Sequence, residues 1–182
     1  MEHDIARVLI SRDEIAQRVA GMADEIARTY SNGDAELTLV TILSGSLIFL
    51  ADLIRCLPMR MKIGLVTVSS YPGATTASRG AKLLSEIRAD IRGRHVLVVD
   101  DILDTGNTLR LVIERLRQQD PASLRTCVLL RKPDKAPPDV QADFVGFDIE
   151  DVFVVGYGLD YNDLYRNYPH IGILRPELYA AG

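Results

Sequence analysis

One stretch of the chain decides the fold: Val98-Val99-Asp100-Asp101-Ile102-Leu103-Asp104-Thr105-Gly106-Asn107-Thr108-Leu109. Its first two residues complete a short apolar run over 95–99, which is typical of a strand covered on both faces. From Leu109 to Leu116, aliphatic side chains recur at i, i+3, i+4 and i+7, the spacing of one helix face. A buried strand followed so soon by a helix predicts a βα unit of a parallel sheet.

The same alternation of strands and helices extends on both sides of this stretch. Upstream, the patterns predict a helix over 11–28, a strand over 37–43, a helix over 47–57 and a strand over 61–69. Downstream, they predict strands over 123–130, 144–149 and 153–155. We therefore expect an α/β fold with a central, mostly parallel sheet flanked by helices, whose ligand binds at the carboxyl ends of the strands.

The bulk composition limits the classes of partner. The 182 residues are 47% hydrophobic and 25% charged, which suits one globular domain. The net charge of -4 gives no basic surface, so nucleic acid is not an expected partner. The acidic N-terminus and the lack of an apolar run of ~20 residues predict no membrane association and a cytoplasmic location.

The cysteines and histidines do not form a metal-binding pattern. Cys56 and Cys127 make no CxxC pair, and the three histidines are scattered along the chain. A structural zinc site needs about four closely spaced ligands. We expect both cysteines to be small hydrophobic residues of the core.

Three carboxylates lie close together after the apolar run. Asp100 and Asp101 are adjacent, and Asp104 follows three residues later. Like charges at this spacing repel one another, which destabilises a buried arrangement. An exposed turn could carry them harmlessly in solvent. At the carboxyl end of a central strand, however, a divalent cation or the hydroxyl groups of a sugar would offset the repulsion.

The residues from Thr105 to Thr108 open the following helix. Small residues at a helix N-terminus let backbone N–H groups converge on an anion, as in many phosphate sites. The alternative is a plain N-cap formed by Asn107 or Thr108. Together, the acids and the helix start indicate a site for a phosphorylated sugar.

Several common motifs are absent from the sequence. Neither GxGxxG nor GxxxxGK[ST] occurs, which disfavours a dinucleotide-binding dehydrogenase and a P-loop kinase. No GxSxG elbow is present. The segment 71–80 is rich in turn residues and long for a hairpin loop, so we favour a lid over an ordinary hairpin loop.

The stretch from Val98 to Leu109 resembles the phosphoribosyl pyrophosphate motif of type I phosphoribosyltransferases, with two hydrophobic residues, two acids and a T-G-x-T loop. Asp104 and the segment 154–162 (VVGYGLDYN) are similar to the hypoxanthine-guanine phosphoribosyltransferases. The similarity extends from about Val40 to Leu174. It implies a single domain over 1–182, a small hood formed by the N-terminal segment and about 150–182, and a flexible lid at about 70–80.

The resemblance also implies an activity and roles for individual residues. The expected reaction transfers 5-phosphoribosyl from phosphoribosyl pyrophosphate to N9 of hypoxanthine or guanine, with Mg²⁺ as cofactor. The implied donor-binding residues are Asp100, Asp101, Asp104, Thr105, Gly106, Asn107, Thr108, Ser44, Gly45 and Arg166. The implied purine-binding residues are Lys132, Phe153, Val154 and Asp160, the implied metal-binding residues are Asp100, Asp101 and Asp160, and the lid begins at Ser70 and Tyr71.

Two of these implied roles concern the chemistry of the base. Asp104 would accept a proton from purine N7 as the general base. Lys132 would donate to the 6-oxygen of the purine, although a solvated charge at a strand end is the alternative for this residue.

One residue departs from the family pattern. Ser44 occupies a position where many members carry a lysine, which bears on donor affinity and on a dimer contact. Family habit also implies a homodimer or homotetramer.

Two other functions compete with this one. The first is a regulator that senses the sugar donor and binds nucleic acid, which the acidic composition disfavours. The second is a transferase for uracil or xanthine. Lys132 and the segment 153–161 favour a purine over a pyrimidine, but they do not decide among hypoxanthine, guanine and xanthine.

Overall fold

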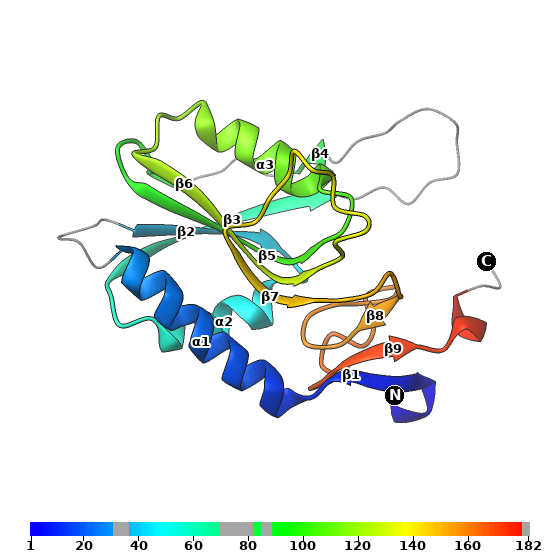
Figure 1. Cartoon of the computed structure of the whole chain (residues 1–182). Coiled ribbons are helices and arrows are strands. Elements are labelled where there is room, and N and C mark those ends of the chain that lie inside the picture. Colours follow the sequence, from blue (N-terminus) through cyan, green and yellow to red (C-terminus); the bar gives the residue numbers. More distant parts are fainter. Residues whose placement is uncertain (31–36, 70–81, 85–88, 180–182) are drawn as a thin grey trace.

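The computed structural model describes residues 1–30, 37–69, 82–84 and 89–179. Within these ranges, the chain forms a six-stranded sheet between layers of helices and a separate three-stranded sheet below it (Figure 1). The large sheet has the order β4-β3-β2-β5-β6-β7. Its strands are β2 (Leu37–Leu43), β3 (Met61–Ser69), β4 (Lys82–Leu83), β5 (His95–Leu103), β6 (Ser123–Arg131) and β7 (Phe144–Asp148).

The five longer strands of this sheet run parallel, and only β4 pairs antiparallel, with β3. The chain moves outward in opposite directions from β2 and β5, so these two neighbours form the topological switch point. The expected α/β fold with a mostly parallel central sheet is therefore confirmed.

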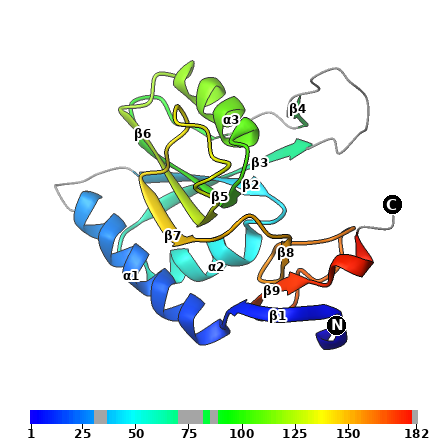
Figure 2. The same ribbon diagram turned by 45° about the vertical axis from the view of Figure 1, so that its right-hand side comes forward.

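Helices cover both faces of the sheet. Figures 1 and 2 show α1 (Arg12–Tyr30) and α2 (Leu47–Cys56) on one face and α3 (Asn107–Arg117) on the other. Alternate residues of β5 pack against the helices on opposite faces of the sheet, because successive side chains of a strand point to opposite faces. Leu97 and Val99 pack with α1 and α2, whereas Val96 and Val98 pack with α3.

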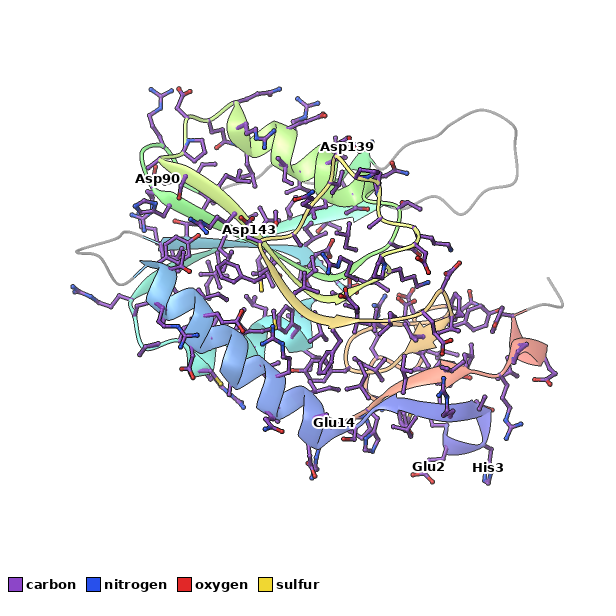
Figure 3. All side chains as sticks on the ribbon, in the orientation of Figure 1. Glu2, His3, Glu14, Asp90, Asp139 and Asp143 are labelled. Atoms are coloured by element: carbon purple, nitrogen blue, oxygen red, sulfur yellow. The ribbon has the colours of Figure 1, made fainter. Side chains whose placement is uncertain are left out.

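The helix α1 begins with a capping box between Ser11 and Glu14. The backbone N–H and the hydroxyl of Ser11 donate to Glu14 Oε2 at 2.8 and 2.6 Å, and the Glu14 N–H donates to Ser11 Oγ at 3.3 Å. These hydrogen bonds lower the pKa of Glu14. Figure 3 shows Glu14 at this end of the helix, which then continues two residues beyond the predicted Arg28.

The second sheet joins the two ends of the chain. It consists of β1 (Ile5–Ile10), β9 (Ile171–Leu174) and β8 (Val154–Val155), all antiparallel. Short 3₁₀ helices, η1 (Glu2–Asp4) and η2 (Pro176–Leu178), flank it. This sheet corresponds to the hood that the resemblance implied.

Two expectations from the sequence need correction. The strand β5 does not end at Val99 but continues to Leu103, because Asp100, Ile102 and Leu103 pair with β6. Cys127 is buried in β6 as expected, but Cys56 lies exposed at the end of α2 rather than in the core. No helix in the described ranges is long and apolar enough to cross a membrane.

Candidate active site

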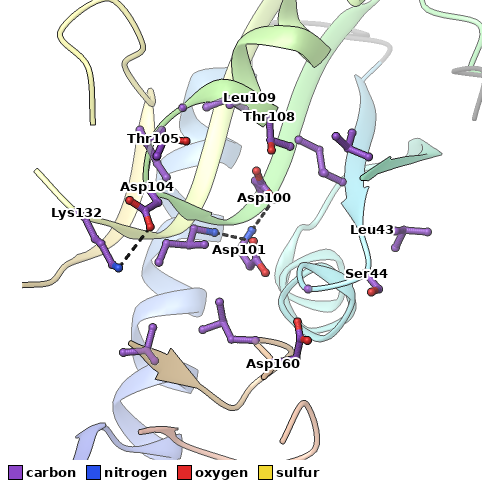
Figure 4. Close-up of a pocket in the computed structure, with 18 of the residues that line it drawn as sticks. Leu43, Ser44, Asp100, Asp101, Asp104, Thr105, Thr108, Leu109, Lys132 and Asp160 are labelled. Atoms are coloured by element: carbon purple, nitrogen blue, oxygen red, sulfur yellow. Dashed lines mark hydrogen bonds and ion pairs between the residues drawn. The ribbon is translucent and has the colours of Figure 1, made fainter. Parts of the chain in front are cut away.

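A cavity of about 830 Å³ opens at the carboxyl ends of β2 and β5, next to the switch point (Figure 4). The end of β2, the β5–α3 turn, the residue after β6 and the segment from Phe153 to Arg166 contribute to its wall. This volume lies within the usual range for small-molecule sites. The cavity is also where an open parallel sheet is expected to bind its ligand.

Most of the residues singled out in the sequence meet in this cavity. Those that line it are Ser44, Gly45, Asp100, Asp101, Asp104, Thr105, Gly106, Thr108, Lys132, Phe153, Val154, Asp160 and Arg166. Asn107 is exposed at the start of α3 and does not line the cavity. The lid at 70–80, with Ser70 and Tyr71, falls outside the described residues.

Asp100, which is buried, and Asp101, which is half-buried, form an acidic pair in β5. The Asp101 N–H donates to Asp100 Oδ1 at 3.0 Å, and the Ile102 N–H donates to Asp101 Oδ1 at 2.8 Å. Burial, and then the charge of Asp101, raise the pKa of Asp100 well above its ordinary value. Burial also raises the pKa of Asp101, an effect that its hydrogen bonds and Arg166 oppose only in part. The pair therefore favours a positive or hydrogen-bond-donating ligand.

Asp100→Asn is expected to raise the Tm of the ligand-free protein at neutral pH by about 2–4 °C. This is the shift that a gain of about 1 kcal/mol in the free energy of unfolding produces in a protein of this size. Because the pKa of Asp100 is raised in the folded protein, ionisation of this side chain destabilises the fold. This loss of stability is absent below the ordinary aspartate pKa of 3.8, and it grows as the pH rises through the raised pKa. Thermal melts with chelator at about pH 4 and about pH 7.5 should show a gain only at the higher pH. The control variant Asp24→Asn, at an exposed position, should leave the Tm unchanged at both pH values. A lower Tm for Asp100→Asn than for the wild type at about pH 7.5 would contradict the prediction.

Two glycines allow three segments to meet at this pair. A Cβ on Gly45 would lie 1.7 Å from Asp101 Oδ2, so any side chain there would displace the carboxylate. Gly158 has a φ of +103°, and its Cβ would lie 2.0 Å from the Gly45 carbonyl oxygen. The loop after β2, the strand β5 and the segment after β8 therefore approach one another as closely as backbone permits.

The helix α3 presents its N-terminus to the cavity. Gly106 is its N-cap with a φ of +73°, and no side chain caps the helix. The plain N-cap by Asn107 or Thr108 is therefore wrong, since both residues lie inside the first turn. The first N–H groups of a helix have no intrahelical partner, and they carry positive potential. Gly106 and the first turn of α3 thus suit a phosphate group.

Lys132 and Asp104 form an ion pair at the cavity wall. The Lys132 side chain is only 8% exposed, and its ammonium donates to Asp151 Oδ1 at 3.1 Å and to Asp104 Oδ2 at 3.4 Å (Figure 4). The solvated strand-end charge considered for Lys132 is therefore wrong. Lys135 pairs with the same two carboxylates, at 3.0 Å from Asp151 Oδ1 and 3.8 Å from Asp104 Oδ1.

This cluster contains two residues that the sequence did not reveal. Asp151 and Lys135 carry no motif of their own, and only the fold places them beside Lys132. Hydrogen bonds from Lys135 and then Lys132 lower the pKa of Asp151. Asp104 Oδ1, in contrast, is buried without a hydrogen-bond partner. The Asp104 side chain as a whole is 36% exposed and lines the cavity, so its carboxylate can take a proton from a ligand there.

Asp160 and Arg166 form the third group of polar residues in the cavity. Arg166 contacts Asp160 Oδ1 at 2.9 Å, the Gly158 carbonyl oxygen at 2.8 Å and Asp163 Oδ1 at 2.9 Å. The Asp163 N–H donates to Asp160 Oδ2 at 2.9 Å. Arg166 is thereby held with its guanidinium at the cavity wall, where it also lowers the pKa of Asp101 by its charge.

The carboxylates fit a hard divalent cation. Mg²⁺ prefers oxygen ligands and commonly uses one or two carboxylates together with substrate phosphates and water. Burial raises the pKa of both Asp100 and Asp101, and the charge of Arg166 opposes this only in part and only at Asp101, so a cation would stabilise the ionised pair. In the described part of the chain, no group of three or more His, Cys, Asp or Glu side chains is arranged to hold a metal. The donor set therefore suits a cation shared with a ligand.

Comparison with known proteins gives a consistent result. Residues 11–162 match the phosphoribosyl transferase domain family. The chain is 40% identical over 181 residues to the hypoxanthine-guanine phosphoribosyltransferase of Bacillus subtilis, covering 100% of this chain and 99% of that protein. It is 42% identical over 180 residues to that of Mycobacterium avium, covering 97% of this chain and 89% of that protein.

A solved structure agrees with these relatives. A hypoxanthine phosphoribosyltransferase from Staphylococcus aureus superposes with a TM-score of 0.91 at 37% identity, covering 98% of this chain and 96% of that one. The match in fold thus accompanies a match in sequence over nearly the whole length. The chain belongs to the phosphoribosyl transferase domain family.

Proposed function

We propose that this protein is a hypoxanthine-guanine phosphoribosyltransferase of purine salvage, whose products are IMP or GMP and pyrophosphate. One observation carries the proposal: a single cavity joins the Asp100–Asp101 pair, an open helix N-terminus and the Lys132–Asp104 pair. These three features suit a ribose, a phosphate and a 6-oxo purine, respectively. The relatives that span the chain carry names of the same activity.

The sugar donor occupies the end of the cavity near the switch point. Its 5-phosphate binds the backbone N–H groups of residues 104–108, supported by the bare N-terminus of α3. Its ribose hydroxyls donate to Asp100 and Asp101. Its pyrophosphate lies between the loop at Ser44 and Gly45 and the guanidinium of Arg166, all of which line the cavity. Because Ser44 brings no cation, Arg166 is the protein charge we assign to the pyrophosphate.

Magnesium is the proposed cofactor. Because no three acidic side chains of the described residues are arranged around one point, Asp100, Asp101 and Asp160 would hold it together with oxygen atoms of the sugar donor. When bound, it supplies positive charge that stabilises the departing pyrophosphate. In the ligand-free protein both oxygens of Asp160 are already engaged, by Arg166 and by the Asp163 N–H. Arg166 must therefore share or release Asp160 when the metal and the pyrophosphate enter.

The purine occupies the end of the cavity near Lys132. Phe153 stacks on the ring, the backbone of Val154 reads its edge, and Lys132 donates to the 6-oxygen. Adenine carries an amino group at this position, so it would face Lys132 without an acceptor. An unsatisfied polar contact of this kind costs about 1–3 kcal/mol. Adenine is therefore expected to be a poor substrate.

The reaction forms one bond and breaks one at C1 of the ribose. Purine N9 attacks C1, the bond from C1 to the pyrophosphate oxygen breaks, and the proton of N7 passes to Asp104. Holding both reactants in contact in one cavity supplies a large part of the acceleration, up to roughly 7–11 kcal/mol in favourable cases. The lid proposed for 70–80 would exclude water from the activated sugar.

A spectrophotometric assay tests the proposal. It combines the protein with phosphoribosyl pyrophosphate, Mg²⁺ and, in turn, hypoxanthine, guanine, xanthine, adenine and uracil. We expect turnover of 6-oxo purines that is abolished by a chelator and restored by Mg²⁺, with adenine and uracil inactive. If a folded protein that still binds the donor shows no turnover with any base, the proposal is refuted. That result would favour the alternative function, a regulator that senses the sugar donor.

Other properties belong to the same proposal. We propose a single domain over 1–182 with the hood at its two ends, a cytoplasmic enzyme, and a homodimer or homotetramer. Neither nucleic acid nor a membrane is a proposed partner. Gel filtration with light scattering measures the oligomeric state, and nucleic-acid retention at low salt tests the absence of that partner.

A further inference from the structure

The C-terminal segment packs an aromatic ring against Phe153. The rings of Tyr179 and Phe153 are stacked, with centroids 4.9 Å apart and an interplanar angle of 26°. Tyr161 meets Phe153 edge-on, at 5.7 Å and 90°. Phe153 is thus enclosed by two rings from different parts of the sequence, one on its face and one at its edge.

Tyr179 contacts Phe153 from outside the cavity. Phe153 belongs to the cavity wall and is 37% exposed, whereas neither Tyr179 nor Tyr161 contributes to that wall. The face of Phe153 that Tyr179 covers is therefore not the surface offered to a ligand. Tyr179 instead forms a second layer behind the ring.

The backbone fixes Tyr179 in this place. It follows η2, and its N–H donates to the Pro176 carbonyl oxygen at 3.2 Å. Just before η2, Arg175 donates from its backbone to the Asp4 carbonyl oxygen at 2.9 Å and from Nε to the His3 carbonyl oxygen at 2.7 Å. The N-terminus thus anchors the strand end that carries Tyr179.

The same strand end is joined to Phe153 itself. The Leu174 N–H donates to the Phe153 carbonyl oxygen at 3.1 Å. The residue after Phe153 is Val154, the first of β8, and it pairs with Ile173 of β9. The backbone of Phe153 and the segment that leads to Tyr179 are therefore in fixed register. A ring attached to this segment can hold the orientation of the Phe153 side chain.

We propose that Tyr179 is a positioning residue for the purine: by stacking behind Phe153, it fixes the angle at which Phe153 presents its free face to the base. This inference rests on the proposed function, in which Phe153 stacks on the purine. A Phe side chain has no polar atom to orient it, so only packing determines its rotamer. Tyr179 supplies this packing at the site of base recognition, and it is not among the residues that line the cavity.

The effect is expected in base binding and not in donor binding. Tyr179→Ala should raise the KM for hypoxanthine by about 3- to 10-fold, the factor that a lost aromatic pair produces. The KM for phosphoribosyl pyrophosphate should stay unchanged, and kcat should change less than about 2-fold. Tyr179→Phe keeps the ring and should restore the wild-type KM for hypoxanthine. Steady-state kinetics with each substrate varied in turn measure all three parameters.

Two further variants separate this role from a general loss of structure. Tyr179→Leu keeps apolar bulk without a ring and should match Tyr179→Ala, which covers the case in which the alanine variant fails to fold. Leu178→Ala removes a 41% exposed side chain from the same segment and should leave every parameter at the wild-type value. Thermal melts of all variants check that the fold is retained.

Three results would overturn the inference. An unchanged KM for hypoxanthine in folded Tyr179→Ala and Tyr179→Leu would show that the stack does not position Phe153. A lower KM would show that Tyr179 competes with the base for the ring, and failure of Tyr179→Phe to restore the KM would show that the ring is not the active feature. An inactive wild-type protein in the same assay would instead refute the proposed function, and this inference with it.

Discussion

Replacing Asp104 with Asn lowers kcat by about 10²–10⁴-fold, the usual contribution of a positioned general base. The amide keeps the shape of the carboxylate but cannot take the N7 proton. In the structure, Asp104 combines one oxygen near the ammonium of Lys132 with a second, buried oxygen that has no hydrogen-bond partner. The side chain is 36% exposed and lines the cavity, so the carboxylate is within reach of the purine.

The measurement is steady-state turnover of hypoxanthine, with the binding of phosphoribosyl pyrophosphate to the same variant measured by calorimetry. Donor binding should stay measurable, because the helix N-terminus and the acidic pair are unchanged. Asp134→Asn is the matched control, since Asp134 is exposed on the loop after β6 and does not line the cavity. Turnover of Asp104→Asn equal to that of the control would remove Asp104 from the mechanism.

Replacing Lys132 with Met is expected to lower kcat/KM for hypoxanthine by about 10- to 100-fold, the loss that corresponds to one unsatisfied buried hydrogen bond. Methionine keeps the apolar length of the side chain and removes the ammonium. The preference for hypoxanthine over adenine should shrink, because no donor then faces the 6-position of the base. Both quantities follow from kcat/KM for hypoxanthine and for adenine, measured with wild-type and variant protein at saturating phosphoribosyl pyrophosphate.

Lys135→Met is the matched control for this variant. Lys135 pairs with the same two carboxylates, Asp104 and Asp151, but its side chain is 43% exposed and lies outside the cavity wall. A charge effect on the carboxylates would appear in both variants, whereas loss of base recognition should appear in Lys132→Met alone. Equal losses in the two variants would assign Lys132 to the charge balance of the cluster and not to the base.

The sequence by itself determined the layers of the fold. The apolar run of β5 reflects burial on both faces, β2 is rich in β-branched residues, and β3 shows alternation. Helical packing leaves apolar residues at a spacing of three and four, so the helices could be predicted too. The strands of the hood were harder to predict from the sequence. The hood strands β1 and β9 are short, half of β1 is exposed, and the pairing between them shifts register twice, so neither shows a clean alternation. Only pairing between the chain ends makes them strands.

The sequence also determined which residues form the donor site, because Asp100 to Thr108 lie on one turn, where neighbours in sequence are neighbours in space. The tertiary structure decided everything that depends on distant segments. It brought Asp151 and Lys135 to Lys132, placed the carbonyl of Gly45 against Gly158, and stacked Tyr179 behind Phe153. A local pattern records the chemistry of a single turn, whereas contacts between segments arise only when the sheet and the hood pack together.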